Sequence, residues 1–403
     1  MAQKTPGVTH IPGTQPKLWR ARYRDAAGKE HQKQFTSWVA ARDWRVEQLA
    51  AVRAGSWVDP TAGRESLQAY AERWLAGAGL RTQSRRVTET RLRLHVYPAL
   101  GHRPIADLRH SELRSWLSEL ERTMAPWSVY GVHSTLRSVL NSAVADRVVA
   151  RSPFDRIPLR KVKRQVPVVP LTVPQVASVL AVSPPPYGAL FALGAATGMR
   201  GSELRGLEVS SIDFLRRTVA VRRQLVTAPH GDVRQAHAWG PPKTDTSERT
   251  LDVPQWALDV VSAHLAARPA VTVTLPVVDT PRVSERTGAL VFTTKTGRPI
   301  SQTNLHATWN RALVRAGLER AKGQGPHALR HHVASLLIDA GESVKVVQAQ
   351  LGHASAAETW DTYSHLFPDP EGRVRQVLAD AWQAGQQDVG EGHAGDLRAD
   401  LDG

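Results

Sequence analysis

The sequence of 403 residues contains no cysteine, which excludes disulfides, a thiol nucleophile, an Fe–S cluster and cysteine-ligated zinc. It also lacks an uncharged apolar run of the roughly 18 residues that a membrane span needs, and its first ten residues lack the apolar segment of a signal peptide. No phosphate-binding GxxxxGK motif is present. We therefore expect a cytoplasmic protein without membrane contacts or ATP hydrolysis.

Acidic side chains are scarce, because 37 Asp and Glu stand against 52 Lys and Arg, for a formal net charge of +15. This balance predicts a polyanionic partner such as DNA. The basic excess is concentrated in the first 166 residues, where 29 basic side chains face 14 acidic ones. Arginine outnumbers lysine by 42 to 10, which favours phosphate binding, although the codon bias of a GC-rich genome explains the ratio equally well.

Residues 19–24 (WRARYR) alternate apolar and basic side chains, the pattern of a strand with one face of each kind. A turn at 25–28, a return strand at 29–36 and a helix at 37–54 are expected to follow. The basic face either enters a groove of DNA or keeps the sheet soluble. Its candidate DNA contacts are Arg20, Arg22 and Arg24.

Residues 61–155 show apolar side chains at helical spacing and predict four helices, separated in the middle by Pro98, Gly101 and Pro104. A basic run at 156–164 (RIPLRKVKR) resembles an extended linker that lies along phosphates. The apolar positions that define the four helices are Leu67, Tyr70, Trp74 and Leu75; Val87, Leu92, Leu94 and Val96; Leu113, Trp116, Leu117 and Leu120; and Val129, Val132, Leu136, Val139, Leu140 and Val144. The linker candidates are Arg160, Lys161, Lys163 and Arg164.

From Val168 onward the pattern mixes helices and strands. Strands are expected at 218–222 and 249–253, on either side of a polar hairpin whose tip, 241–250 (PPKTDTSERT), carries Lys243. Helices are expected at 172–182, 187–196, 255–267, 302–316, 327–340, 344–350 and 370–384.

Two arginine motifs could bind an anion. In TGMRGSEL, a helix begins at Arg200, so this side chain lies at a helix N-terminus, with Glu203 one turn later. In PHALRHH, His327 and Arg330 share one helix face and could bind a single phosphate. The i, i+4 spacing of His327 and His331 also fits a metal pair, but no HExxH glutamate accompanies it.

The segment LGHASAAETWDTY places Tyr363 ten residues after His353. A tyrosine phenol, with a pKa of about 10, is a poor nucleophile unless cations stabilise its oxyanion. The side chains that could do so are Arg200, Arg330, His327 and His353. A lysine such as Lys243 could protonate a leaving 5′-oxygen.

Taken in order, these motifs resemble those of the tyrosine recombinase (phage integrase) family. The resemblance implies that Tyr363 attacks a DNA phosphate, giving a 3′-phosphotyrosyl intermediate without metal or other cofactor. It further implies that Arg200 and Arg330 bind the non-bridging oxygens and that Lys243 is the general acid. His327 would assist proton transfer, His353 would donate a hydrogen bond to the phosphate, and Glu203 would support Arg200. Lys295, in VFTTKTGRP, is the alternative general acid.

The resemblance also implies a mainly α, multidomain protein with small β-sheets. Residues 1–60 would form a β-β(-β)-α arm-binding module, 61–166 a helical core-binding domain with the linker, and 167–385 an α+β catalytic domain. The acidic composition and low hydrophobicity of residues 386–403 independently predict a disordered tail. The expected substrates are attachment sites of a phage or integrative element, of actinobacterial type. The expected partners are three further copies in a homotetramer around a Holliday junction, an excisionase and a host DNA-bending factor.

Two other functions remain open at this point. A type IB topoisomerase uses similar residues to relax DNA as a monomer without site preference. A regulator could retain the fold and bind DNA without cutting it. The full set of catalytic side chains and the two additional DNA-binding segments favour site-specific integration over both.

Overall fold

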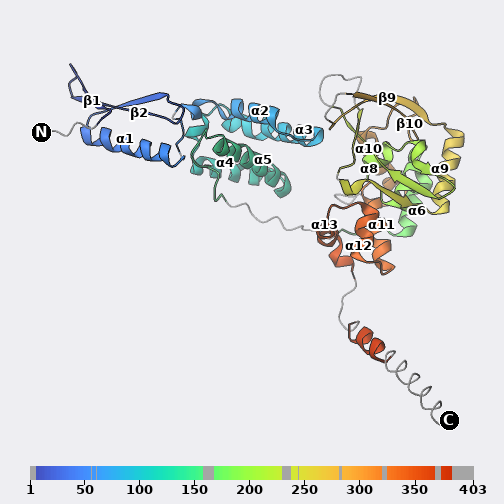
Figure 1. Ribbon diagram of the computed structural model, residues 1–403. Coiled ribbons are helices and arrows are strands. Elements are labelled where there is room, and N and C mark those ends of the chain that lie inside the picture. Colours follow the sequence, from blue (N-terminus) through green and yellow to red (C-terminus); the bar gives the residue numbers. More distant parts are fainter. Residues whose placement is uncertain are drawn as a thin grey trace, which may run out of the picture. The chain divides into compact units, whose positions relative to one another are not determined.

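A computed structural model describes residues 6–55, 57–59, 61–157, 168–228, 237–243, 245–280, 284–319, 325–367 and 374–383. The chain divides into two compact units, Met1–Gln165 and Val166–Gly403 (Figure 1). None of the helices among the described residues has the length and apolar character needed to span a bilayer.

The first unit begins with a three-stranded antiparallel sheet in the order β1-β2-β3, against which helix α1 packs. The predicted hairpin and helix are confirmed, and β1 adds a third strand. In β2 the side chains of Ala21 and Tyr23 are buried while Arg22 and Arg24 are exposed, so the two-faced strand is confirmed as well. Ser37 caps α1 by accepting a hydrogen bond from the backbone N–H of Ala40. The bounds are β1 Val8–Ile11, β2 Leu18–Arg24, β3 Glu30–Phe35 and α1 Trp38–Arg53.

The four predicted helices that follow are all present, but the break at Pro98 is wrong. Helix α3 continues into a π-helical stretch, Leu92–Gly101, that contains this proline. The inner face of that stretch is buried, and its wider turns accommodate the missing proline N–H. Val87 and Leu94, expected to be inward, are 37% and 51% exposed. The bounds are α2 Leu67–Gly77, α3 Thr82–Arg91, α4 His110–Thr123 and α5 Pro126–Ala145.

The second unit is built around α7, an apolar helix that contacts α6, α9 and α11. Thr172 caps α6 through a reciprocal pair of hydrogen bonds with Gln175. The predicted helices from 172 to 350 are confirmed within two residues, and helix is also present at 374–383. The bounds are α6 Val173–Val182, α7 Tyr187–Thr197, α8 Gly201–Arg205, α9 Gln255–Ala267, α10 Gln302–Arg315, α11 Ala328–Asp339, α12 Val344–Leu351 and α13 Ala356–Tyr363.

The second unit also contains two small sheets, and their strand pairing differs from the hairpin expected from the sequence. The predicted strands β5 and β8 do pair antiparallel. The chain between them, however, forms a second pair, β6 and β7, in a separate four-stranded sheet, so Lys243 follows β7 and does not lie at a hairpin tip. Strands β9 and β10, which complete that sheet, were not predicted. The orders are β4-β5-β8 and β10-β9-β7-β6, with β4 Ile212–Asp213, β5 Thr218–Val221, β6 Gln224–Thr227, β7 His237–Gly240, β8 Arg249–Asp252, β9 Val271–Val277 and β10 Ser284–Leu290.

The core of the second unit predicts a large stability effect at Trp309 on α10. This side chain is fully buried and meets the ring of Phe191 edge to face, with 5.0 Å between centroids. We expect Trp309→Ala to lower the free energy of unfolding by about 3 to 5 kcal/mol, because it leaves a cavity. Val314→Ala, on the same helix at a side chain that is 60% exposed, is the control and should change it by less than about 0.5 kcal/mol. Urea unfolding measures both, and equal effects would contradict the packing described.

Candidate active site

Arg200 owes its position to the turn between α7 and α8. Helix α7 ends at Gly198 in the left-handed conformation, with φ of +69°. A Cβ there would lie 2.9 Å from Leu351 Cδ2, so both the backbone angle and the space favour glycine. Arg200 is the N-cap of α8, and its backbone N–H donates to Glu203 Oε2 at 2.9 Å. The predicted helix start is therefore confirmed.

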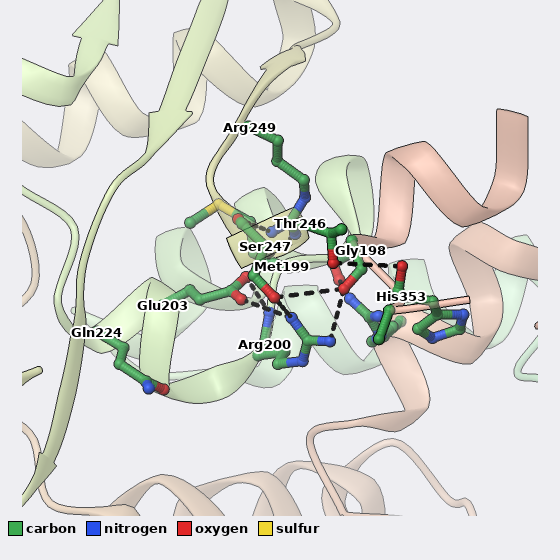
Figure 2. A network of polar contacts seen from close by, with 12 residues as sticks. Gly198, Met199, Arg200, Glu203, Gln224, Thr246, Ser247, Arg249 and His353 are labelled. Atoms are coloured by element: carbon green, nitrogen blue, oxygen red, sulfur yellow. Dashed lines mark hydrogen bonds and ion pairs between the residues drawn. The ribbon is translucent and has the colours of Figure 1, made fainter. Parts of the chain in front are cut away.

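The guanidinium of Arg200 is fixed by three partners (Figure 2). Its Nη1 donates to Glu203 Oε1 and to Ser247 Oγ, each at 3.0 Å. Its Nη2 donates to the carbonyl oxygen of Gly352 at 2.9 Å. On the other side of the carboxylate, Arg249 Nη2 donates to Glu203 Oε2 at 3.1 Å. We call Arg200, Glu203, Ser247 and Arg249 the Glu203 network.

Glu203 is the anion of this network and is only 1% exposed. Burial alone would raise the pKa of its carboxyl, but the charges of Arg249 and Arg200, with their hydrogen bonds, lower it below its ordinary value. The carboxylate is therefore ionised, and its charge offsets part of the charge of two arginines. The sequence analysis assigned Glu203 a supporting role, and this geometry is compatible with it.

Arg330 lies on α11 and is 1% exposed. Its Nη1 donates to the carbonyl oxygen of Gly198 at 3.0 Å, and its buried Nη2 has no hydrogen-bond partner among the described residues. Burial, followed by the charge of Arg200, lowers the pKa of Arg330 to about 9. A buried cation with an unused N–H group fits an anionic ligand such as a phosphate oxygen.

His353 follows Gly352, which ends α12 with φ of +66°. Its ring is buried, and its Nδ1 lies 2.8 Å from Thr359 Oγ1. Burial and then the nearby Arg330 lower the pKa of His353 to about 4. The ring is thus neutral near pH 7 and stacks on Tyr363, with 6.3 Å between centroids and 14° between planes.

Tyr363 is the last residue of α13 and is 1% exposed. Its ring belongs to a small apolar cluster with residues of α11 and α12, among them Ala334 and Leu351. Its hydroxyl lies 2.8 Å from His331 Nδ1. The segment that precedes it forms helix α13, which was not predicted and is capped by Ser355.

His327 is the N-cap of α11, and its ring meets that of His331 edge to face at 4.9 Å. Burial, the neighbouring His331 and the charges of Arg330 and Arg200 all lower the pKa of His327. Its side chain is nevertheless exposed. In the part of the chain that the structure describes, no three histidine or acidic side chains form a metal-binding group.

The two candidate lysines are both exposed. Lys243 precedes by four residues Ser247, whose hydroxyl accepts a hydrogen bond from Arg200. Lys295 lies in a separate turn, closed by a hydrogen bond from the backbone N–H of Thr294 to the carbonyl oxygen of Arg298 at 2.8 Å. Lys243 is thus the one of the two lysines that lies close in the chain to a side chain in contact with Arg200.

The predicted DNA contacts fall into two groups. In the N-terminal sheet, Arg22 and Arg24 lie 3.8 and 3.9 Å from the carboxylate of Glu30, and Arg20 is half-buried. The linker candidates at 160–164 lie outside the described residues, as does the acidic tail at 386–403.

Ser247 and Arg249 were not predicted from the sequence, and His331 was considered only as a metal ligand. Ser247 and Arg249 are linked to the site through partners 46 to 105 residues away, such as Glu203 and Gly352. Spacing along the chain cannot reveal such contacts. A weak signal was available for Arg249, because it begins a strand just after the Lys243 motif.

Residues 171–369 match the model of the phage integrase family, and residues 67–158 match that of the phage integrase central domain. An integrase of Streptomyces ambofaciens is 30% identical over 303 residues, which cover 72% of this chain and 74% of that protein. The chain belongs to the phage integrase family. It is a tyrosine recombinase, an enzyme that cleaves and rejoins DNA in site-specific recombination.

Solved structures of other integrases share the fold of this recombinase. The Tn1549 transposon integrase in complex with a circular intermediate DNA gives a TM-score of 0.64 at 20% identity, covering 78% of this chain and 98% of that one. A lambda integrase tetramer bound to a Holliday junction gives 0.54 at 17% identity, covering 88% and 94%. The multidomain, mainly helical fold expected from the sequence is thereby confirmed.

The Glu203 network predicts a pH-dependent stability effect in this recombinase. Glu203→Gln leaves two mostly buried arginines without their anion, and we expect a loss of about 3 to 5 kcal/mol at pH 7. Because the carboxyl pKa is lowered in the folded state, its contribution is complete above the unfolded pKa of about 4.3 and disappears as the pH falls through the folded value. Urea unfolding of both proteins from pH 7 to pH 3 should therefore show a shrinking difference. A difference that stays constant or grows in acid would contradict the assignment.

Proposed function

We propose that Tyr363 is the nucleophile of this recombinase and that Arg200, Arg330 and His353 bind the phosphate it attacks. Arg200 donates to the carbonyl of Gly352, Arg330 donates to that of Gly198, and His353 stacks on the phenol. Gly352 directly precedes His353, and Arg330 is near enough to Tyr363 for the phenol to affect the pKa of the guanidinium. Donors from three helix ends therefore lie around one tyrosine, and this arrangement carries the proposal. The unused, buried Nη2 of Arg330 is a further donor for a phosphate oxygen.

In the proposed reaction, Tyr363 Oη forms a bond to phosphorus while the bond from phosphorus to the 5′-oxygen breaks. Lys243 gives a proton to that oxygen, and His327 assists proton transfer. The product is a 3′-phosphotyrosyl bond of energy similar to the phosphodiester, so a 5′-hydroxyl from another strand can reverse the step without ATP. The guanidiniums stabilise the charge that develops on the phosphate oxygens.

We further propose that the substrates are attachment sites of a phage or integrative element. A homotetramer exchanges the strands through a Holliday junction, and the lambda integrase tetramer on such a junction supports this. In this assignment residues 1–60 bind arm sites, 61–166 bind the core site, 167–385 catalyse and 386–403 form the acidic tail. An excisionase and a host DNA-bending factor are the accessory partners. We place the reaction in the cytoplasm, where bacterial DNA is found.

Covalent trapping tests the nucleophile. A nicked duplex from the ends of the protein's own element, incubated without metal, should give a protein–DNA adduct stable in SDS, because the short strand released at the nick diffuses away. Tyr363→Phe should bind the duplex equally well and give no adduct. Adducts on every DNA sequence would instead indicate a topoisomerase, and binding without any adduct would indicate a regulator.

A modified leaving group identifies the general acid. A 5′-bridging phosphorothiolate releases a thiolate, which leaves without protonation. The Lys243→Ala variant should therefore cleave an ordinary duplex about a hundredfold or more slowly than wild type. It should cleave the phosphorothiolate duplex at nearly the wild-type rate. Lys295→Ala, the matched control, should behave like wild type on both duplexes. The reverse pattern would transfer the role to Lys295.

A further inference from the structure

The hydroxyl of Tyr363 contacts a histidine to which the proposed mechanism gives no role. His331 Nδ1 lies 2.8 Å from Tyr363 Oη, and the two ring centroids are 5.6 Å apart at an interplanar angle of 68°. This distance is a normal hydrogen bond. Because the phenol is 1% exposed, the proton of its hydroxyl must pass to a group inside the protein or to one that DNA brings.

The other histidines near the phenol are occupied differently. His353 stacks on the ring face of Tyr363, and its Nδ1 is bonded to Thr359 Oγ1 at 2.8 Å. The ring of His327 meets that of His331 edge to face, with 4.9 Å between centroids. His331 Nδ1, by contrast, lies at hydrogen-bond distance from the tyrosine oxygen.

We propose that His331 is a catalytic residue, the acceptor of the Tyr363 proton; this rests on the proposed function of Tyr363 as nucleophile. As the bond from Oη to phosphorus forms, the Oη–H bond breaks and an Nδ1–H bond forms on His331. The bond from phosphorus to the 5′-oxygen breaks, and this oxygen keeps the electron pair and takes a proton from Lys243. On rejoining, His331 returns its proton to the phenolate as that group leaves phosphorus.

The proposed roles of His331 and Lys243 concern different protons of the same reaction and can be tested separately. Lys243 protonates the leaving oxygen, whereas His331 takes the proton of the attacking oxygen. His331 and Tyr363 are more than thirty residues apart in the sequence. A leaving group that needs no proton should therefore restore the cleavage rate of Lys243 variants and leave that of His331 variants unchanged. A histidine that only oriented the ring would be replaced well by glutamine or asparagine, whose amides also form hydrogen bonds but accept no proton.

Single-turnover cleavage of the nicked duplex tests this role. We expect His331→Gln and His331→Asn to bind the duplex as wild type does and to cleave it about a hundredfold or more slowly. The phosphorothiolate duplex should leave that defect in place. His332→Gln is the matched control, because it removes the neighbouring buried histidine, bonded to the carbonyl of Leu171 at 2.7 Å. It should lower stability and keep the cleavage rate of the folded protein within about threefold of wild type.

The pH dependence gives a second readout. Wild-type cleavage should slow as the pH falls, because protonated His331 accepts no proton, and this limb should be absent from both His331 variants. Other titratable or charged groups on the elements around the phenol stay in place in every protein compared. These are His327, Arg330, His332, Asp339, Lys345, His353, Glu358, Asp361 and His365. The comparison between variants therefore isolates His331.

Three outcomes would overturn the assignment. They are cleavage by both His331 variants at the wild-type rate or faster, restoration of both by the phosphorothiolate, and an unchanged acid limb. Faster cleavage would mean that His331 restrains the tyrosine. Failure of the proposed function is distinguishable, because the wild-type protein itself would then form no adduct, whereas here it does.

Discussion

The buried carboxylate of Glu203 lies between two guanidiniums, and the geometry of the site depends on it. Arg200 and Arg249 each bind one of its two oxygens. Both also donate to backbone carbonyls at the C-terminal end of α12, Arg200 to that of Gly352 and Arg249 to that of Gln350. Without the carboxylate, the cations would repel each other in a poorly solvated place. With it, one arginine is oriented for a ligand and the other ties α8, β8 and α12 together.

This arrangement keeps part of the positive charge unneutralised where the reaction needs it. Glu203 contributes one negative charge against two arginines, and Arg330 adds a third buried guanidinium with an unused N–H group. Burial lowers the pKa of Arg330, which means that the folded protein holds a cation in an unfavourable environment. A phosphate of DNA would supply the missing anion, and a transition state with more charge would gain more still.

Much of the fold was readable from the sequence because its signals are local. Caps such as Thr172 with Gln175, and the alternation in residues 19–24, depend on neighbours a few positions away. Strand β9 was missed because Pro276 interrupts a β-branched run, and proline is tolerated there only with a suitable position in the sheet. The site motifs were found one by one, but the contacts of Ser247 with Gly352 and of His331 with Tyr363 join distant segments, so only the folded chain reveals them.

The identity of the atom that becomes bonded to DNA tests the proposed mechanism most directly. The adduct on a nicked duplex can be digested with protease and nuclease, and the linked peptide sequenced by mass spectrometry. We predict a single modified peptide in which Tyr363 carries a nucleotide through its 3′-phosphate. A phosphate on any other side chain, or a 5′-phosphate on Tyr363, would contradict the mechanism.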